Sequence, residues 1–467
     1  MNKSKNTYNM IDEDILKSIV FFSIPLLGTS IIQQLYNITD FIFIGNFIGK
    51  KAAAAVGASS LLFTCLIGLF TGISIGVSII TSQTIGENKK EKLQSIICTA
   101  FIFSILLGIF TTIFGLIFSN IFLKSIKIPP EIKDDAEIYL NIYLLSMLPM
   151  ILYNIFSGII RASGNSKITL YILAIGGFFN IIGNYFFIVF LELGVAGASI
   201  STLISQIITA SLSIFYVIKS GLFSINNLKF SKFNSNILKT ILYNGLPSGI
   251  QASIMTFSNI ILQYFINTYG EDIIAAYITY FKVENFLWLP IVAIGQAVTT
   301  FVGQNYGAKN YERIKKGVVV ATILSITIVL ILIVIISSFP NTFFKIFIKD
   351  ITVIRLGIDL LYFIFPFYWL YSILENFGAA LRGIGHSLLS MTVGIITLSL
   401  TRILILIYLS KLNVGYKELA IIYPVTWSLT AISYSVLFFI YLKIKISEDF
   451  FLKEKIRIFT ICSQILK

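Results

Sequence analysis

The chain has 467 residues, of which 56% are hydrophobic and 12% charged, with a formal net charge of +13. This composition excludes a soluble globular protein and is typical of a polytopic membrane protein. The basic excess does not indicate nucleic-acid binding, because the Lys and Arg residues gather in alternate loops between apolar runs.

Apolar runs of roughly 20 residues recur along the whole sequence, and each is long enough to cross ~30 Å of hydrocarbon. In lipid each segment must satisfy its own backbone hydrogen bonds, and these runs are too long for barrel strands. We therefore expect an all-α integral membrane protein with twelve transmembrane helices. The expected spans are 18–47, 53–80, 93–119, 136–160, 168–190, 195–218, 239–267, 273–302, 316–338, 357–380, 387–409 and 419–442.

The distribution of basic residues predicts the topology. With the N-terminus inside, roughly two-thirds of all Lys and Arg fall on one face, which is the positive-inside bias. We therefore expect a multi-pass protein of the cytoplasmic (inner) membrane of the cell, with both termini in the cytoplasm. Segment 1–17 is polar and leads into a long span without a small-residue cleavage site, so no removable signal peptide is expected.

The second half of the sequence repeats the first. Three motif pairs lie about 221 residues apart, and three matches in register indicate a duplication. The pairs are Pro25 with Pro247, Gln83 and Gly86 with Gln304 and Gly307, and Arg161 and Gly164 with Arg382 and Gly385. Each repeat holds six spans, an even number, so the halves enter the membrane in the same direction.

This duplication predicts two parallel six-helix bundles with a cleft between them, the arrangement of an alternating-access transporter. We expect the N-terminal bundle at 1–218 and the C-terminal bundle at 239–442. A cytoplasmic linker is expected at 219–238, and a basic cytoplasmic tail at 443–467.

The first predicted helix contains a charged residue in an otherwise apolar stretch, Asp40 within 24–49. A charge in the bilayer interior costs at least about 2.5–3.5 kcal/mol on insertion scales, so it is a candidate functional residue. Pro25 lies earlier in the same stretch, where it removes a backbone hydrogen bond and favours a kink, so we expect a hinge there. The alternative is a structural Asp that is hydrogen-bonded to its neighbours.

Depth along the helices predicts which polar residues meet Asp40. At 1.5 Å per residue, Asp40 lies roughly 33 Å from the cytoplasmic end of its helix. Asn180 and Asn184 share a face late in the fifth span, Thr202 lies early in the sixth, and Asn37 shares the face of Asp40. A carboxylate among amide and hydroxyl oxygens suits a proton or Na⁺, with Asp40 as the metal ligand if Na⁺ is the coupling ion. The alternative is a polar packing contact between helices.

The second half offers candidates for substrate binding or a second ion site. Gln251 lies in the seventh span, Lys282 and Glu284 in the eighth, and Glu375 in the tenth, where it is the repeat-equivalent of Asn154. Glu284 and Glu375 are each candidates for attracting a cationic substrate or holding a second proton. The alternative is a structural ion pair, and we expect Lys282 to pair with Glu375.

Two further features of the second half carry weaker predictions. Aromatic residues are dense in the eighth and tenth spans, and aromatic faces attract organic cations, although most of these rings are expected to be core or lipid-facing. Arg402 in the eleventh span is expected to extend to the outer membrane surface.

Sequence motifs for nucleotide binding and hydrolysis are absent. The chain contains no GxxxxGK[ST], no HExxH and no GxSxG pattern. We therefore expect a protein that is not an enzyme, is not driven by ATP through this chain, and needs no cofactor other than H⁺ or Na⁺ as coupling ion.

The chain resembles the multidrug and toxic-compound extrusion (MATE) family of secondary transporters over essentially its whole length. The motifs that carry the resemblance are QQLYNITDFIFIGNFIG, AAAAVGASS, TSQTIGENKKEK, RASGNS, FFNIIGNYFFIVFLELGVAGASISTLISQ, GLPSGIQ, FVGQNYGAKNYERIKK and LRGIGHS. The resemblance implies twelve helices in two bundles, a V-shaped cleft, and export of organic cations coupled to inward movement of Na⁺ or H⁺.

Site residues can be carried over from the family by position. The resemblance implies that Asp40 is the acidic residue of the cation site in the N-terminal bundle, with Asn180 and Thr202 as its partners. It also implies that Pro25 is the proline associated with bending of the first helix.

Three positions depart from the family pattern. Asn184 stands where many bacterial members carry an Asp, which leaves Asp40 as the only charged member of its site. Gln251 and Tyr371 stand where one branch carries a Glu and an Asp. These two departures argue against the second Na⁺ site of that branch in this chain.

The sequence therefore predicts a cation-coupled antiporter that exports small organic cations by alternating access, embedded in the lipid bilayer and with no nucleic-acid partner. A monomer suffices, because one chain holds both bundles. The alternative within the superfamily is a flippase of a lipid-linked precursor, which would need a basic cluster that the chain lacks; a channel or receptor would need a continuous polar pore. The identity of the drugs and the choice between H⁺ and Na⁺ stay open.

Overall fold

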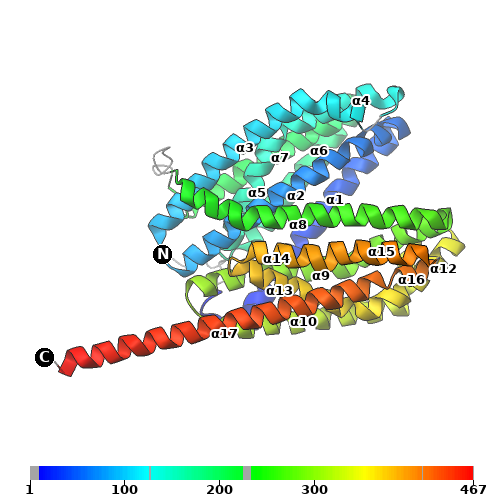
Figure 1. Ribbon diagram of the computed structural model, residues 1–467. Helices are drawn as coiled ribbons and strands as arrows, with labels where there is room; N and C mark the ends of the chain where they lie inside the picture. The colour runs from blue at the N-terminus through cyan, green and yellow to red at the C-terminus, as the bar shows by residue number, and fades with distance from the viewer. Residues whose placement is uncertain (1–9, 126–127, 225–232, 413, 466–467) are drawn as a thin grey trace. The chain divides into compact units, whose positions relative to one another are not determined.

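The computed structural model describes residues 10–125, 128–224, 233–412 and 414–465. The side chains of 37, 58, 60–65 and 449–465 also lie outside the described part. Throughout the described ranges the chain forms helices and the turns that join them, without a β-strand, which confirms the all-α prediction (Figure 1).

The chain divides into two compact units, Met1–Thr256 (unit 1) and Phe257–Lys467 (unit 2). The helices of unit 1 are α1 (Ile15–Phe43), α2 (Lys50–Gly86), α3 (Lys90–Ser125), α4 (Pro130–Leu145), α5 (Met147–Ala162), α6 (Ser166–Asn184) and α7 (Gly194–Lys219), followed by α8 (Ser235–Ile266), which begins in unit 1 and ends in unit 2. Within this unit α6 packs against both α1 and α7.

Unit 2 contains longer helices together with short helical segments. They are α9 (Glu271–Gly307), α10 (Tyr311–Ser338), α11 (Pro340–Lys345), α12 (Ile351–Ile364), α13 (Tyr368–Gly383), α14 (Ser387–Gly394), α15 (Thr401–Lys411), α16 (Tyr416–Leu419) and α17 (Ile422–Ile465). Helix α13 packs against α9, α10 and α17.

The predicted spans correspond to these helices. Among the described residues, 10 helical stretches are long and apolar enough to cross a membrane. An eleventh span is the bent pair α4 and α5. The remaining predicted span, 239–267, coincides with the 32-residue helix α8. The twelve-helix prediction thus agrees with the structure.

The bend between α4 and α5 was not predicted. The two helices meet at Ser146 with an angle of 44°. Pro149 lies in the first turn of α5, where it lacks the N–H that would continue the α4 hydrogen-bond ladder. Pro366 interrupts the span formed by α12 and α13 in the same way, within the 3₁₀ turn Phe365–Phe367.

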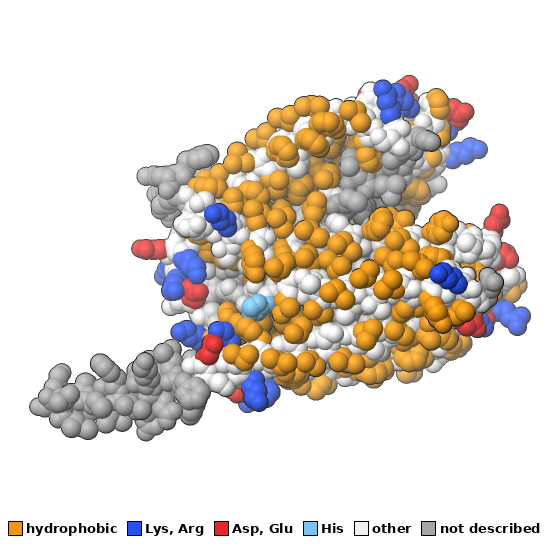
Figure 2. Space-filling model, in the orientation of Figure 1, with side chains coloured by type: hydrophobic (Ala, Val, Ile, Leu, Met, Phe, Trp, Pro, Cys, Tyr) orange, Lys and Arg blue, Asp and Glu red, His pale blue; other side chains and the backbone are white. Residues whose placement is uncertain are grey.

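Hydrophobic side chains cover the sides of the helices, and charged side chains lie near the helix ends (Figure 2). On α10, for example, Ile323, Leu330 and Val334 are exposed although they are apolar. In a membrane this surface faces lipid, so the exposed apolar side chains are consistent with a multi-pass protein. Polar N-caps start several helices, such as Asp14, whose side chain accepts a hydrogen bond of 2.9 Å from the backbone of Lys17.

Helices α2 and α8 make a very close contact within unit 1. Each carries a GxxxG motif, Gly72 to Gly76 and Gly245 to Gly249. A Cβ atom added to Gly72 would lie 2.3 Å from the backbone nitrogen of Gly249. The two backbones therefore touch without intervening side chains, which only glycine permits.

Candidate functional site

The candidate ion site lies in unit 1, where helices end in π-helical turns. Asp40 is in the last turn of α1, directly before the π-helical turn η1 (Ile44–Ile48). Asn184 is the last residue of α6, directly before η2 (Tyr185–Phe190). Such turns widen the helix locally and are frequent at functional sites.

Hydrogen bonds join Asp40 to the two neighbouring helices. The Nδ2 of Asn184 donates a hydrogen bond of 2.5 Å to Oδ1 of Asp40 and one of 3.3 Å to Oδ1 of Asn180. The hydroxyl of Thr202 donates a hydrogen bond of 3.3 Å to Oδ2 of Asp40. The structure therefore brings together four of the five residues predicted for this site.

An amide oxygen remains available beside this carboxylate. Oδ1 of Asn184 is buried and has no hydrogen-bond partner among the described residues. Neutral amide and hydroxyl groups surround Asp40, and within the described ranges no Lys, Arg or His forms an ion pair with it. Oxygen atoms without a competing cation are what a proton or a small hard cation requires.

The two other predicted residues of α1 are less informative. The side chain of Asn37 lies outside the described part. Pro25 lies inside α1, which continues through it, and its carbonyl accepts a hydrogen bond of 2.9 Å from the hydroxyl of Thr29. The hinge at Pro25 stays a prediction.

The sequence did not single out the tyrosines near this carboxylate. Tyr36, Tyr139 and Tyr143 are all within electrostatic range of Asp40. Tyr36 precedes Asp40 by four residues and so shares its helix face, a signal that was present in the sequence. Tyr139 and Tyr143 come from α4, and only the tertiary fold places them there.

Two of the candidates for a second site, Glu375 and Lys282, have different neighbours in unit 2. Glu375 forms an ion pair of 2.8 Å with Arg382, seven residues later in the chain. The expected pair of Lys282 with Glu375 is wrong: Lys282 is exposed, and its Nζ lies 5.7 Å from the centre of the Phe347 ring. Arg382 reaches the carboxylate because it lies two helical turns further along α13 on the same face.

Asn154 and Gln251 belong to unit 1, whereas the other candidates belong to unit 2. The side chain of Asn154 donates a hydrogen bond of 2.9 Å to the carbonyl of Met150 in its own helix. A local contact of this kind gives no indication of a binding site.

Glu284 lies among aromatic residues of unit 2. The hydroxyl of Tyr280 donates a hydrogen bond of 3.4 Å to Oε1 of Glu284. Nearby, the ring of Trp427 packs edge-on against Tyr368 and Tyr371, at 5.0 and 5.5 Å between ring centres. This cluster combines a carboxylate, which also has the guanidinium of Arg402 within electrostatic range, with several aromatic faces that can attract an organic cation.

Arg402 does not extend to the membrane surface as expected. It is 2% exposed, and its Nη1 donates a hydrogen bond of 2.8 Å to Oδ1 of Asn259. Its guanidinium carbon lies 5.4 Å from the centre of the Tyr423 ring. The expectation was wrong because α15 turns this residue into unit 2, where an amide and an aromatic ring compensate for lost water.

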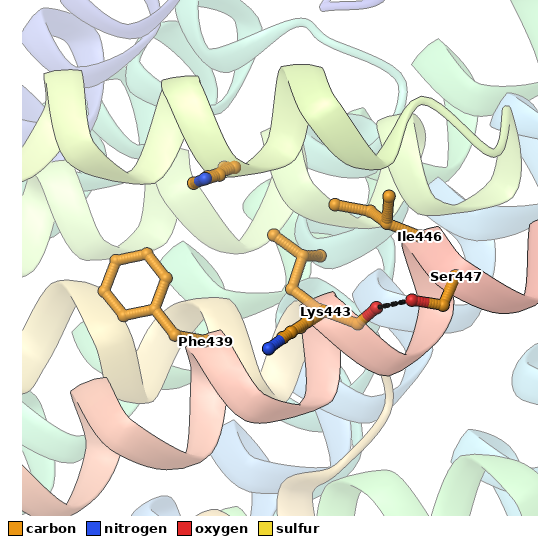
Figure 3. Close-up of a pocket in the computed structure, with 6 residues that line it drawn as sticks. Phe439, Lys443, Ile446 and Ser447 are labelled. Atoms are coloured by element: carbon orange, nitrogen blue, oxygen red, sulfur yellow. Dashed lines mark hydrogen bonds between the residues drawn. The ribbon is translucent and has the colours of Figure 1, made fainter. Parts of the chain in front are cut away.

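A cavity of about 280 Å³ lies between α10 and α17, lined by Lys315, Phe439, Leu442, Lys443, Ile446 and Ser447 (Figure 3). Ser447 hydrogen-bonds the carbonyl of Lys443 at 3.0 Å. None of the predicted site residues lines this cavity.

Comparison with known proteins identifies relatives for most of the chain. The chain matches the family described as MatE over residues 25–186 and again over 247–409, so both halves match the same family. It is 29% identical over 307 residues to the probable multidrug resistance protein YpnP of Bacillus subtilis, covering 66% of this chain and 68% of that protein. It is 25% identical over 407 residues to the probable multidrug resistance protein NorM of Thermotoga maritima, covering 84% of each.

Solved structures share the fold. An outward-facing multidrug resistance MATE family transporter of the MOP superfamily superposes with a TM-score of 0.87 at 23% identity, over 96% of this chain and 100% of that one. A MOP superfamily transporter from Pyrococcus furiosus superposes with a TM-score of 0.85 at 24% identity, over 95% and 99%.

Proposed function

Because the chain belongs to the MatE family of membrane transporters, we propose that it is an antiporter that exports small organic cations in exchange for H⁺ or Na⁺. The proposal includes alternating access across the cytoplasmic membrane by a single chain, with both termini in the cytoplasm and no enzymatic activity. Relatives named as probable multidrug resistance proteins support small-molecule drugs as the substrate class.

One observation carries the proposal. The carboxylate of Asp40 is held inside a membrane-spanning bundle by the amide of Asn184 and the hydroxyl of Thr202. A charge at this depth is energetically costly, so its presence indicates a function. The neutral partners leave the charge of Asp40 uncompensated. A proton or Na⁺ bound at Asp40 would neutralise that charge, so binding and release of the ion can favour different conformations of the bundle.

Groups in unit 2, other than Asp40, would attract the substrate. Glu284 and the rings around Trp427 present a carboxylate and aromatic faces in unit 2, with the guanidinium of Arg402 within electrostatic range of that carboxylate. The aromatic faces favour a cation with apolar groups over an anion. Binding of coupling ion and substrate at separate groups permits exchange, provided that each favours a different conformation.

Transport in everted vesicles tests the proposal. Uptake of a fluorescent organic cation would be driven by a pH gradient or by a Na⁺ gradient, each imposed separately, for wild type and Asp40→Asn. The matched control is Asp134→Asn, which makes the same chemical change at an exposed residue of α4.

We expect uptake under one of the two gradients, its loss in Asp40→Asn, and wild-type uptake in Asp134→Asn. The gradient that drives uptake would identify the coupling ion. Wild-type uptake by a folded Asp40→Asn protein would refute the assignment of Asp40, and no uptake of any organic cation under either gradient would refute the antiporter.

A further inference from the structure

The two repeats can be compared at the positions predicted for the ion site. Asn37 and Asn259 lie 222 positions apart, the same separation as Pro25 and Pro247 in the same pair of helices, α1 and α8. At this separation the position equivalent to Asp40 is Leu262, which is 2% exposed. The second repeat therefore lacks the carboxylate of the first.

Burial patterns align the partner helices. Four buried residues of α6 recur at the same spacing in the segment formed by η7 (Ile395–Leu400) and α15. The matched pairs are Gly176 with Leu398, Gly177 with Ser399, Asn180 with Arg402 and Asn184 with Leu406, all 222 positions apart. Arg402 thus stands where the first repeat has Asn180.

The last pair of helices, α7 and α17, shows a similar match at a separation one residue shorter. Buried Thr202, Thr209 and Ser213 match buried Tyr423, Thr430 and Tyr434 at a separation of 221 positions. Tyr423 therefore takes the place of Thr202. The equivalents of Asn37, Asn180 and Thr202 are, in the second repeat, Asn259, Arg402 and Tyr423, and these three are in contact in unit 2 through the guanidinium.

The first repeat has an anionic site and the second has a cation at the same place. The guanidinium of Arg402 is hydrogen-bonded to Asn259 and lies over the ring of Tyr423. Its Nε and the hydroxyl of Tyr423 are buried without a hydrogen-bond partner among the described residues, so this charge is incompletely compensated by direct contacts. Glu284 is the carboxylate within electrostatic range.

We propose that Arg402 is a tethered cation, which fills in the second repeat the place that the coupling ion takes in the first. The second unit is then held permanently in the counterpart of the ion-bound state, and only the site at Asp40 responds to the coupling ion. This inference rests on the proposed function of Asp40. The inference adds that one ion site, not two, operates in each transport cycle. It also predicts that a free guanidinium ion can replace the side chain of Arg402 when that side chain is removed.

Chemical rescue tests the proposal. Arg402→Ala would be purified in detergent, and its melting temperature measured with guanidinium or methylguanidinium at millimolar concentration. Urea at the same concentration is the matched control ligand, because it is planar and of similar size but uncharged. The same ligands would be added to proteoliposomes for transport.

We expect guanidinium to raise the melting temperature of Arg402→Ala and to restore at least half of a transport rate that the substitution lowers at least tenfold. Urea should have no effect on this variant, and guanidinium none on wild type. Equal rescue by urea, or no rescue by either compound, would overturn the proposal.

The double variant Asp40→Asn/Arg402→Ala separates this inference from the function on which it rests. Its melting temperature should still rise with guanidinium, because that readout requires no transport and no ion at Asp40. If Arg402→Ala does not fold, the comparison of Arg402→Lys with Arg402→Met replaces it. We expect the lysine variant to be stable and active, and a methionine variant that matches it in both respects would overturn the proposal.

Discussion

The side-chain amide of Asn184 donates a hydrogen bond of 2.5 Å to a carboxylate oxygen of Asp40, although 144 residues separate them in the chain. The hydroxyl of Thr202 reaches the other oxygen at 3.3 Å. Hydrogen bonds to a charged acceptor contribute about 1.5–3 kcal/mol, and shorter bonds are the stronger ones. The two hydrogen bonds therefore predict that substitutions of Asn184 and Thr202 affect transport unequally.

Substitution of Asn184 should weaken transport more than substitution of Thr202. We expect Asn184→Ala to change the coupling-ion concentration that gives half-maximal transport by about tenfold, and Thr202→Val by a few-fold. Transport measured against a series of ion concentrations checks this. Equal effects of the two substitutions would contradict the order of the hydrogen bonds. The control is Thr256→Val, because the hydroxyl of half-buried Thr256 donates its hydrogen bond within its own helix, to the carbonyl of Ala252.

The contact between α2 and α8 predicts a strict requirement for glycine. A Cβ atom at Gly76 would lie 2.4 Å from the carbonyl oxygen of Ile241, so Gly76→Ala must push the helices apart. We expect a loss of about 1–3 kcal/mol in stability, the usual cost of overpacking. Thermal unfolding in detergent measures it. Gly57→Ala, in the same helix with open space at its Cβ, should leave stability unchanged or slightly higher.

The ion pair of Glu375 with Arg382 predicts a structural role for both residues. Their side chains are only 20% and 15% exposed, so Glu375→Gln leaves a largely buried guanidinium without its partner. We expect a loss of about 1–3 kcal/mol in stability. Reversal of the pair, Glu375→Arg with Arg382→Glu, should recover part of it. A Glu375→Gln protein of full stability that has lost transport would instead indicate a role in substrate binding.

His386 predicts a pH dependence of stability, because it is the single histidine in the chain. Burial, and then the positive charge of Lys445, lower the pKa of His386 from its usual 6.5. In the window below pH 6.5 the unfolded chain takes up a proton that the folded protein resists, so stability falls as the pH decreases. Melting temperatures from pH 7.5 to about 5.5 should show this decline in wild type and less of it in His386→Gln.

The sequence predicted the helices well because lipid leaves the chain few choices. Long apolar runs must be helical, and their number and the duplication are visible in the letters alone. It did not predict the break at Ser146, since Pro149 can be accommodated in several ways in the first turn of a helix. Nor did it predict that α8 would divide at Thr256 between the two compact units.

The candidate ion site was likewise predicted only in part. Asp40 was recognisable as a rare charge in an apolar stretch, and helix depth predicted that Asn180, Asn184 and Thr202 would meet it. The partners of Glu375 and Arg402 were predicted wrongly, because a long cationic side chain can reach several groups and the sequence does not show how each helix is rotated about its axis.

The sequence alone thus determined that this protein spans the membrane, that it is a duplicated helical transporter of its family, and that one carboxylate lies deep in an apolar helix. These properties follow from composition, periodicity and position along a helix, which are local. Only the tertiary structure decided that Arg402 lies buried against Asn259 and Tyr423, opposite in charge to the site of the first repeat. The reason is physical: the rotation of packed helices is set by the fit of all their side chains together, and no single segment contains that information.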